Sequence, residues 1–592
     1  MKFKIKCKTI KRIPLIASLA FLVGCTTTPV PKPFNSEADK YAYVKEYMRW
    51  YIKEQMDEHD IVGISVALVD DQKIVWSEGF GYADKAKDIK ATPQTRYRAG
   101  SITKLFTDMA AMKLAEQGKI DIDKPFKTYL PEFKMRSRFG STDNITPRNI
   151  MTHHSGIPSE WVDRMFASNP LPYTEHVKVI YDEYVAYKPN TIFSYSNLAL
   201  TMLGDSVEKV SGMKYEKYVD KVLLSPMEMK NADLKMALYG NHASKSYKEG
   251  DETIEYSIGE VPAGALNISV EELSHLIMMI NAKGVYKNHR VLKSSTLNKM
   301  FTVQNKHVAL DLENKIGLGY FIDDVVLGKA EPVYEHGGAT IAHRAYFTVA
   351  PKSKLGIVVM SNSADTNVHE IANTFLKKAW ETKTGTKVVK PKEKVVASSD
   401  FRGTYATMMG KVDFEKKSDK VYIAHTTQGN FSLTKNKNNL YIPKYKLFGL
   451  IPMGDSKLDK AHFYTKDIEG KHIIVMRHKD KDVLVGVKVK THDIPEKWKA
   501  YLGHYKVLNN FEMKEWKIED TEFLIEDGYA LIKETYSSGE TAVAIIKPVN
   551  DTEAIVEGLG RGMQGTIYLK DGIFQAQGLK YKKIEGKIIN DN

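Results

Sequence analysis

Ser101 and Lys104 are the residues with the clearest chemical potential, because they form the tetrad Ser101-Ile-Thr-Lys104 directly after Gly100. Apolar residues at helical spacing follow, so we expect a helix that begins at Ser101 and ends near Gly118. A backbone N–H in the first helical turn has no intrahelical acceptor and can hold a developing oxyanion. Lys104 would lie one turn along on the same face, where an unprotonated amine can accept the serine proton. The alternative is an N-capping serine with a surface lysine.

Three other Ser-x-x-Lys tetrads begin at Ser206, Ser211 and Ser432, so the motif alone is weak. The preceding glycine and the helical run that follows favour Ser101 as a nucleophile.

A second candidate element is Tyr195-Ser-Asn197, which lies at an expected loop-to-helix transition before the apolar run 198–203. A phenol beside an ammonium can be held as phenolate and can move protons between nucleophile and leaving group. Asn197 can donate to a substrate carbonyl and accept from Lys104. The alternative is a buried tyrosine followed by an N-capping asparagine.

The third element is His336-Gly337-Gly338, in the expected strand YEHGGATI. Glycines inside a strand usually mark the close approach of a ligand, so Gly337 and Gly338 are predicted to contact substrate laid along this strand. The N–H of Ala339 would supply a second oxyanion donor. The alternative is a β-bulge at a sheet edge.

The elements that must position these residues form an α/β segment over 39–385. A helix is expected over Asp39–His59, and β-branched residues predict strands at both ends of the segment. Between them lies a largely helical region from Ser101 to about Gly284. We therefore expect one antiparallel sheet, built from distant parts of the chain and flanked by helices, with an all-helical subdomain.

The order of these motifs resembles the serine β-lactamases and penicillin-binding proteins, especially the class C-like group with its D-aminopeptidases, D-stereospecific peptidases and esterases. Local phrases match as well over about residues 40–385: YRAGSITKLFT, MTHHSGIP, VPAGALNISVEEL and HGGATIAHRAYFTVAPKSKLGIVVMSNS. The resemblance implies a β-lactamase/transpeptidase-like fold and an acyl-serine mechanism without a cofactor. It also implies a small-molecule or short-peptide substrate. The catalytic residues would be Ser101, Lys104, Tyr195, Asn197, His336 and Ala339.

One departure from that pattern bears on the substrate. Penicillin-recognising members carry Lys-Thr-Gly at the third element, where this chain has His336, which is mostly neutral near pH 7. The literal Lys383-Thr-Gly385 falls at the end of the expected closing helix, 369–382. We therefore expect peptidase or esterase activity on amide or ester bonds. The alternatives are a true β-lactamase or penicillin-binding protein, and a non-catalytic envelope binding protein.

The C-terminal part reads as two all-β units after a lysine-rich linker at 386–400. Residues 401–495 and 496–592 both begin with an aromatic-x-Gly-x-Tyr motif, at Phe401–Tyr405 and Tyr501–Tyr505, which indicates related barrels. They resemble the lipocalin-like domains that follow some members of the family.

The N-terminus reads as a lipoprotein leader over residues 1–25, followed by a spacer at 26–38. A basic start and a short apolar stretch precede Leu22-Val-Gly-Cys25, which resembles a bacterial lipobox. We expect lipidation of Cys25 and a membrane-anchored envelope protein, in the outer membrane if the host is Gram-negative. The alternative is a cleaved signal with an incidental cysteine.

Composition limits the other classes. The net charge is +13, but lysines and acidic residues are interspersed, which argues against nucleic-acid binding. The two cysteines, Cys7 and Cys25, both lie in the leader, so the folded body has no disulfide and no thiolate metal site. No metal is expected at His153 and His154 either, which we interpret as structural residues at a helix end.

Overall fold

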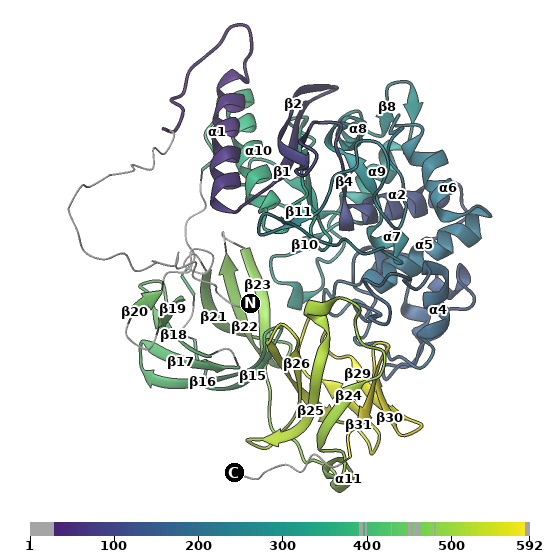
Figure 1. The fold of residues 1–592 in the computed structure, drawn as a ribbon, viewed down its shortest axis with the longest axis vertical. Coiled ribbons are helices and arrows are strands. Elements are labelled where there is room, and N and C mark those ends of the chain that lie inside the picture. The colour runs from purple at the N-terminus through teal and green to yellow at the C-terminus, as the bar shows by residue number, and fades with distance from the viewer. Residues whose placement is uncertain are drawn as a thin grey trace.

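The computed structural model describes residues 29–389, 395–396, 399–427, 429–447, 451–453, 461–478 and 481–585. The predicted leader and the lipidation site at Cys25 lie outside the described residues. Within those residues the chain forms an α/β unit followed by two β units (Figure 1).

The centre of the α/β unit is an eight-stranded antiparallel sheet in the order β10-β11-β12-β13-β14-β1-β2-β3. The first strand pairs with the last long one, from Ile64 opposite Ser361 to Asp70 opposite Leu355. The sheet therefore joins the two ends of the segment, as the sequence predicts. Its strands are β1 (Gly63–Asp70), β2 (Lys73–Asp84), β3 (Ile89–Lys90), β10 (Lys315–Ile316), β11 (Phe321–Asp323), β12 (Val333–Ala339), β13 (Arg344–Ala350) and β14 (Leu355–Ser361).

Helices cover both faces of this sheet. On one face α1 (Ala42–Glu58) and α10 (Val368–Thr384) lie side by side and bury residues such as Ile52 and Phe375 (Figure 1). The other face packs against α2 (Thr103–Glu116) and α8 (Val270–Asn281) in the largest apolar core. That core fixes the helix that carries Ser101 and Lys104 against the sheet.

The helical subdomain contains α5 (Asn197–Ser211) and α6 (Tyr215–Val219) beside α2. Between α2 and α5 the helices are short, namely α3 (Pro147–Met151) and α4 (His176–Val179). Prolines recur through this stretch and cannot continue a helix, so much of it forms loops around the site.

Two β units follow, as predicted. In the first unit the strands pair in the order β18-β17-β16-β15-β23-β22-β21-β19. The two outermost strands of this order, β18 and β19, also pair with each other and close the sheet, and β20 pairs with β19. The second is a closed barrel of eight strands, β24 to β31. The strands of the first are β15 (Gly403–Thr407), β16 (Gly410–Ser418), β17 (Val421–Thr426), β18 (Gly429–Lys435), β19 (Tyr441–Leu447), β20 (Ile451–Met453), β21 (Ala461–Ile468), β22 (Lys471–His478) and β23 (Lys481–Lys488). Those of the second are β24 (Gly503–Val507), β25 (Ile518–Glu526), β26 (Tyr529–Tyr536), β27 (Thr541–Pro548), β28 (Glu553–Val556), β29 (Thr566–Lys570), β30 (Ile573–Ala576) and β31 (Leu579–Lys583).

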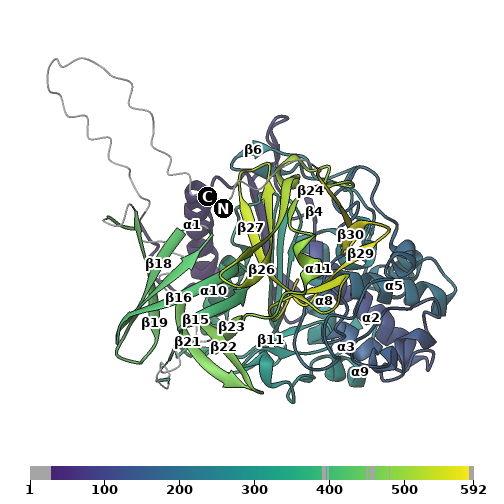
Figure 2. The ribbon, with the colours of Figure 1, turned by 90° about the horizontal axis from the view of Figure 1, so that it is seen from below.

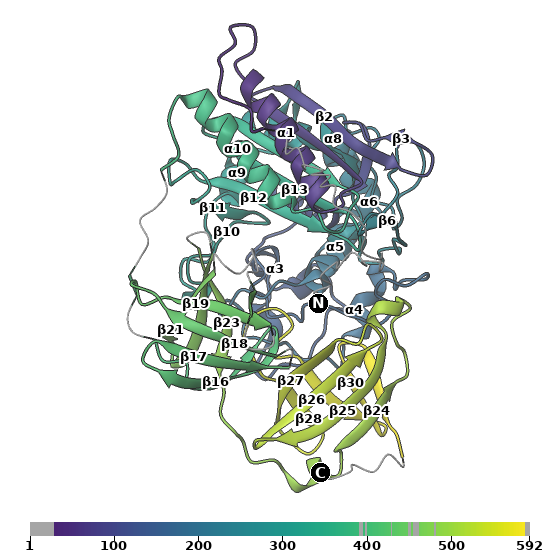
Figure 3. The ribbon, with the colours of Figure 1, turned by 60° about the vertical axis from the view of Figure 1, so that its left-hand side comes forward.

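The two aromatic-x-Gly-x-Tyr motifs occupy equivalent places, because Gly403 and Gly503 each begin the first strand of their barrel. The barrels lie next to each other on one side of the α/β unit (Figures 2 and 3). Ala406 of the first packs with Val543 and Ile545 of the second in a shared apolar cluster. Because the second barrel also contacts the loops between α3 and α5, it lies within reach of the site.

Candidate active site

Ser101 and Lys104 are brought together as the sequence predicts. A 3₁₀ turn at Gly100–Ile102 leads directly into α2, and this places Lys104 Nζ 3.1 Å from Ser101 Oγ. Lys104 is only 1% exposed, and its Nζ also donates to the backbone carbonyl of Ala263 at 2.7 Å. The lysine is therefore held beside the serine hydroxyl by a second, fixed contact.

Two glycines allow the serine segment to lie directly against β12. Gly100 has φ +53°, and a Cβ there would stand 2.7 Å from the N atom of Ala339. A Cβ on Gly338 would stand 1.8 Å from the carbonyl oxygen of Ala99 and 3.3 Å from the N atom of Ser101. This close approach places Ser101 and Ala339 on adjoining backbone segments that both line the cavity, where their N–H groups can act as the two donors of an oxyanion site.

The two glycines of the third motif have different surroundings. Gly338 makes room for the protein's own backbone at Ala99, whereas a Cβ on Gly337 would make only ordinary contacts with the Tyr346 ring at 3.5 and 3.7 Å. The cavity beside Ser101 is lined by Ala339 and Thr340, the residues just beyond both glycines.

Tyr195 lies beside Lys104. Its ring centroid is 5.0 Å from Lys104 Nζ and 4.1 Å from the ring centroid of His153. Ser196 is the N-cap of α5, because its Oγ accepts from Ala199 N at 2.9 Å. The cap fixes the turn that presents Tyr195 to the lysine.

Asn197 also lies at the site, but with other partners than predicted. Its Nδ2 donates to both carboxylate oxygens of Glu160, at 3.0 and 2.9 Å. Lys104 instead donates to Ser101 and Ala263, so the expected hydrogen bond from Lys104 to Asn197 is absent among the described residues. Asn197 still lines the cavity, where it can face a substrate.

His336 is buried, with 2% of its surface exposed, and its Nδ1–H donates to the carbonyl of Gly337 at 2.6 Å. Burial lowers the pKa of His336 to about 3, and the charge of Lys104 acts in the same direction. The imidazole is therefore neutral at pH 7, as expected from the sequence, and brings no positive charge to the third motif.

His153 and His154 lie just after the end of α3, as predicted, and contact residues next to the site. His153 Nδ1 accepts from the backbone N–H of Ser196 at 3.1 Å, and burial holds the pKa of His153 well below its usual range. His154 Nε2 lies 2.7 Å from Asp311 Oδ2. Through its bond to Ser196, His153 fixes the turn that carries Tyr195.

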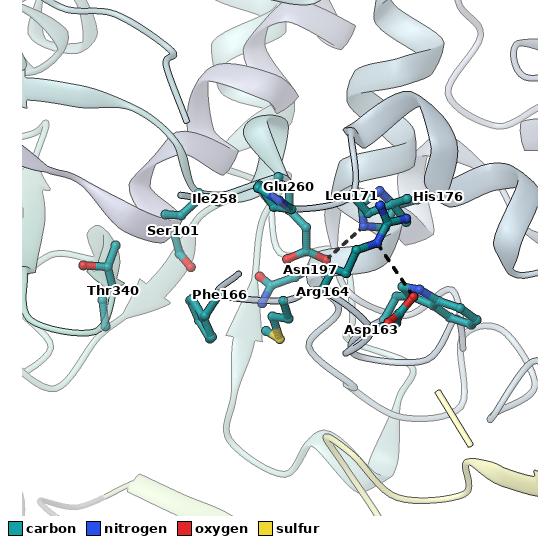
Figure 4. A pocket seen from close by; sticks show the side chains of 17 residues that line it. Ser101, Asp163, Arg164, Phe166, Leu171, His176, Asn197, Ile258, Glu260 and Thr340 are labelled. Carbon is teal, nitrogen blue, oxygen red and sulfur yellow. Dashed lines mark ion pairs between the residues drawn. The ribbon is translucent and has the colours of Figure 1, made fainter. Parts of the chain in front are cut away.

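The cavity beside Ser101 encloses about 70 Å³ and is mostly apolar. Figure 4 shows Glu260 between Ser101 on one side and His176 on the other, with its carboxylate directed toward Asn197. The full lining comprises Ser101, Trp161, Asp163, Arg164, Met165, Phe166, Pro170, Leu171, His176, Asn197, Ile258, Gly259, Glu260, Ala263, Gly264, Ala339 and Thr340.

Arg561, from the loop between β28 and β29 of the second barrel, reaches the site. It forms an ion pair with Glu160, and its guanidinium carbon is 5.0 Å from the centroid of the Tyr195 ring. The same loop is fixed by Gly562 N–H, which donates to Ser159 Oγ at 3.0 Å. The sequence reasoning missed Arg561 and Glu160 because no local pattern links residues so far apart in the chain.

The competing motifs take structural positions. Lys383, in the literal Lys-Thr-Gly, ends α10 and donates to Asp70 and to the carbonyl of Ser353. Ser206 bonds the carbonyl of Leu203 within α5, and Ser432 lies on β18. In the part of the chain that is described, no cluster of three or more metal-ligating side chains occurs, and no helix is long and apolar enough to cross a bilayer.

Known proteins resemble this chain over the α/β unit and beyond. A sequence model of the family described as Beta-lactamase matches residues 48–379. Protein flp of Staphylococcus aureus (strain MW2) is 27% identical over 319 residues, which are 52% of this chain and 61% of that protein. The chain thus spans about three fifths of the length of the curated relatives it matches first.

Solved structures share the fold at low identity. The octameric penicillin-binding protein homologue from Pyrococcus abyssi has a TM-score of 0.52 and 23% identity, covering 75% of this chain and all of that one. SurE has a TM-score of 0.57 and 17% identity, covering 76% of this chain and all of SurE. Both matches extend beyond the α/β unit into the region of the barrels.

Proposed function

The chain belongs to the β-lactamase family of serine hydrolases, and on that premise we propose that it cleaves ester or amide bonds through an acyl-enzyme on Ser101. The observation that carries the proposal is the 3.1 Å approach of Lys104 Nζ to Ser101 Oγ, on a segment that lies directly against the backbone of Ala339. A nucleophile, a base and an oxyanion site are the parts that acyl transfer requires.

In the proposed reaction Ser101 Oγ attacks the substrate carbonyl carbon while its proton passes to Lys104 or Tyr195. The carbonyl oxygen becomes an oxyanion, which the N–H groups of Ser101 and Ala339 stabilise. When the carbonyl re-forms, the bond to the leaving group breaks and the leaving group takes the proton. Water then attacks the acyl-enzyme by the same route and releases the acid and the free serine.

We propose that the preferred substrates lack a free carboxylate next to the scissile bond. A charge-assisted bond to such a carboxylate strengthens binding by roughly tenfold to a hundredfold. At the third motif this chain offers the neutral, buried His336 in place of an ammonium. Short peptides, amides and esters therefore suit the site better than penicillins do.

The test compares covalent labelling and hydrolysis in wild type and Ser101→Ala. We expect Ser101→Ala to lose reaction with a fluorophosphonate probe and all hydrolysis, whereas Ser432→Ala keeps both. A panel of amino-acid amides, short acyl esters and nitrocefin then separates the substrate classes. Faster hydrolysis of nitrocefin than of neutral esters would establish β-lactamase activity in place of our assignment, and full labelling of Ser101→Ala would refute the nucleophile.

We further propose that Cys25 carries a lipid and anchors the protein at the bacterial envelope. The support is the Leu22-Val-Gly-Cys25 sequence after a basic and apolar leader. Cys25→Ser is expected to move the protein from the membrane fraction and to block lipoprotein-type cleavage of the leader. Membrane retention with a cleaved leader in that variant would contradict lipidation.

A further inference from the structure

Glu260 places a carboxylate without a partner in the cavity beside Ser101. It precedes α7 (Val261–Gly264) and is 14% exposed at its side chain. Its Oε1 is buried, and no hydrogen-bond donor among the described residues reaches it. A buried carboxylate oxygen without a donor is costly, so its retention in a cavity indicates that something else supplies the donor.

The cationic side chains near Glu260 form their contacts with other groups. Lys104 donates to Ser101 and Ala263, and Arg561 pairs with Glu160. His176 Nε2 lies 3.9 Å from Glu260 Oε1, beyond hydrogen-bond range. Burial lowers the pKa of His176 to about 4, so the imidazole is neutral at pH 7. None of these side chains donates to Glu260 Oε1, and a group bound in the cavity could do so.

The charge balance of the cavity favours a cation. Asp163 and Arg164 are the other charged residues that line it, and they lie within 3.9 Å of each other and offset one another. Burial raises the pKa of Glu260 and the Glu160 carboxylate acts in the same direction, whereas the charges of Lys104 and Arg561 oppose the shift. A cation bound beside Glu260 would favour its charged form.

The position of the cavity indicates which part of the substrate it holds. Ser101 and Ala339 line it, together with Glu260, whereas Lys104 and Tyr195 are not among the lining residues. The leaving group must lie beside the groups that give it a proton, and these are Lys104 and Tyr195. The cavity therefore takes the acyl part of the substrate.

We propose that Glu260 binds a primary ammonium on the acyl part of the substrate, such as the free α-amine of an aminoacyl ester or amide. This subsite rests on the proposed acyl-enzyme at Ser101. A single carboxylate oxygen suits the point charge of an ammonium better than the planar fork of a guanidinium.

The test uses alanine p-nitroanilide and N-acetylalanine p-nitroanilide in both D and L forms, because acetylation removes the charge and leaves the scissile bond. Wild type is expected to prefer the free amine, and Glu260→Gln to lower its kcat/KM by roughly tenfold to a hundredfold. Glu260→Gln should leave the acetylated substrate within about threefold of wild type. Asp205→Asn is the matched control, because Asp205 is also a buried carboxylate without a hydrogen-bond partner but lies in α5, outside the cavity lining.

Three outcomes would overturn the subsite. Wild type could prefer the acetylated p-nitroanilide for both the D and the L enantiomer. It could also cleave neutral esters but neither enantiomer of alanine p-nitroanilide. Glu260→Gln could also lower both members of the pair equally, which would mean that Glu260 serves the chemistry, for instance at the deacylating water. Fluorophosphonate labelling of Ser101 is measured in parallel. If Ser101 is labelled, these outcomes refute only the ammonium subsite; if labelling is also absent, the hydrolase proposal itself fails.

Discussion

Substitution of Gly338 by alanine tests whether the oxyanion site depends on the contact between β12 and the serine segment. The added Cβ would stand 1.8 Å from the carbonyl oxygen of Ala99, whereas real Cβ atoms stay at least 3.0 Å from such neighbours. The two backbones must therefore separate by about 1.2 Å. Because Ser101 and Ala339 lie on opposite sides of this contact, the distance between their N–H groups changes with it.

A displacement of that size is large for catalysis. Misplacing a reacting group by about 1 Å costs about a hundredfold in rate, and losing one oxyanion donor costs about 10²- to 10³-fold in kcat. We expect kcat/KM of Gly338→Ala for a neutral ester to fall by about 10²- to 10³-fold. The labelling rate with a fluorophosphonate should fall in parallel, because that reaction also places an oxygen in the oxyanion site.

The matched control is Gly337→Ala, one residue earlier in the same strand. A Cβ there meets only ring carbons of Tyr346, at 3.5 and 3.7 Å, so the loss should be far smaller. Thermal unfolding of both variants distinguishes lost activity from lost fold, since overpacking costs about 1–3 kcal/mol. Wild-type kinetics in Gly338→Ala would refute the reasoning. An equal loss in Gly337→Ala would instead support the sequence-based role of both glycines in contacting substrate.

Two further perturbations follow from the site. Arg561→Ala removes the partner that holds Glu160 against Asn197. Because the Arg561 side chain is 46% exposed, we expect kcat/KM to fall only about threefold to tenfold, and Lys570→Ala at the same interface to leave it unchanged. An unchanged kcat/KM in Arg561→Ala would exclude the barrel from the site. The pKa of His336 is lowered from 6.5 to about 3 in the folded protein. Between these pH values the unfolded chain binds a proton at this histidine and the folded protein does not, so the free energy of unfolding decreases as the pH falls from about 6.5 toward 3. In urea unfolding, His336→Gln should therefore lose about 2 kcal/mol less than wild type between pH 7 and pH 5, and equal losses would show that His336 is not the group that titrates.

Much of the fold could be predicted from the sequence because the patterns that indicate its helices and strands are local. The β-branched runs gave β1 and β14, and the apolar period after Ser101 gave α2, because alternation and helical spacing reflect burial on one face of a single element. The stretch between α2 and α5 is less regular than predicted, because α3 and α4 span only five and four residues and the prolines that recur between them cannot lie inside a helix. Its loops instead provide much of the cavity lining.

The sequence by itself indicated that Ser101 and Lys104 lie next to each other, since the glycine before them and the apolar run after them place both in one helical turn. It also determined that the third motif carries no lysine. Only the tertiary structure decided what the neighbours of that pair are. Asn197 was found bound to Glu160 and not to Lys104, and Arg561 arrives from a barrel whose loop has no local signature. Such contacts join residues that are distant in the chain, and their geometry is set by packing between units, which no spacing within one segment encodes.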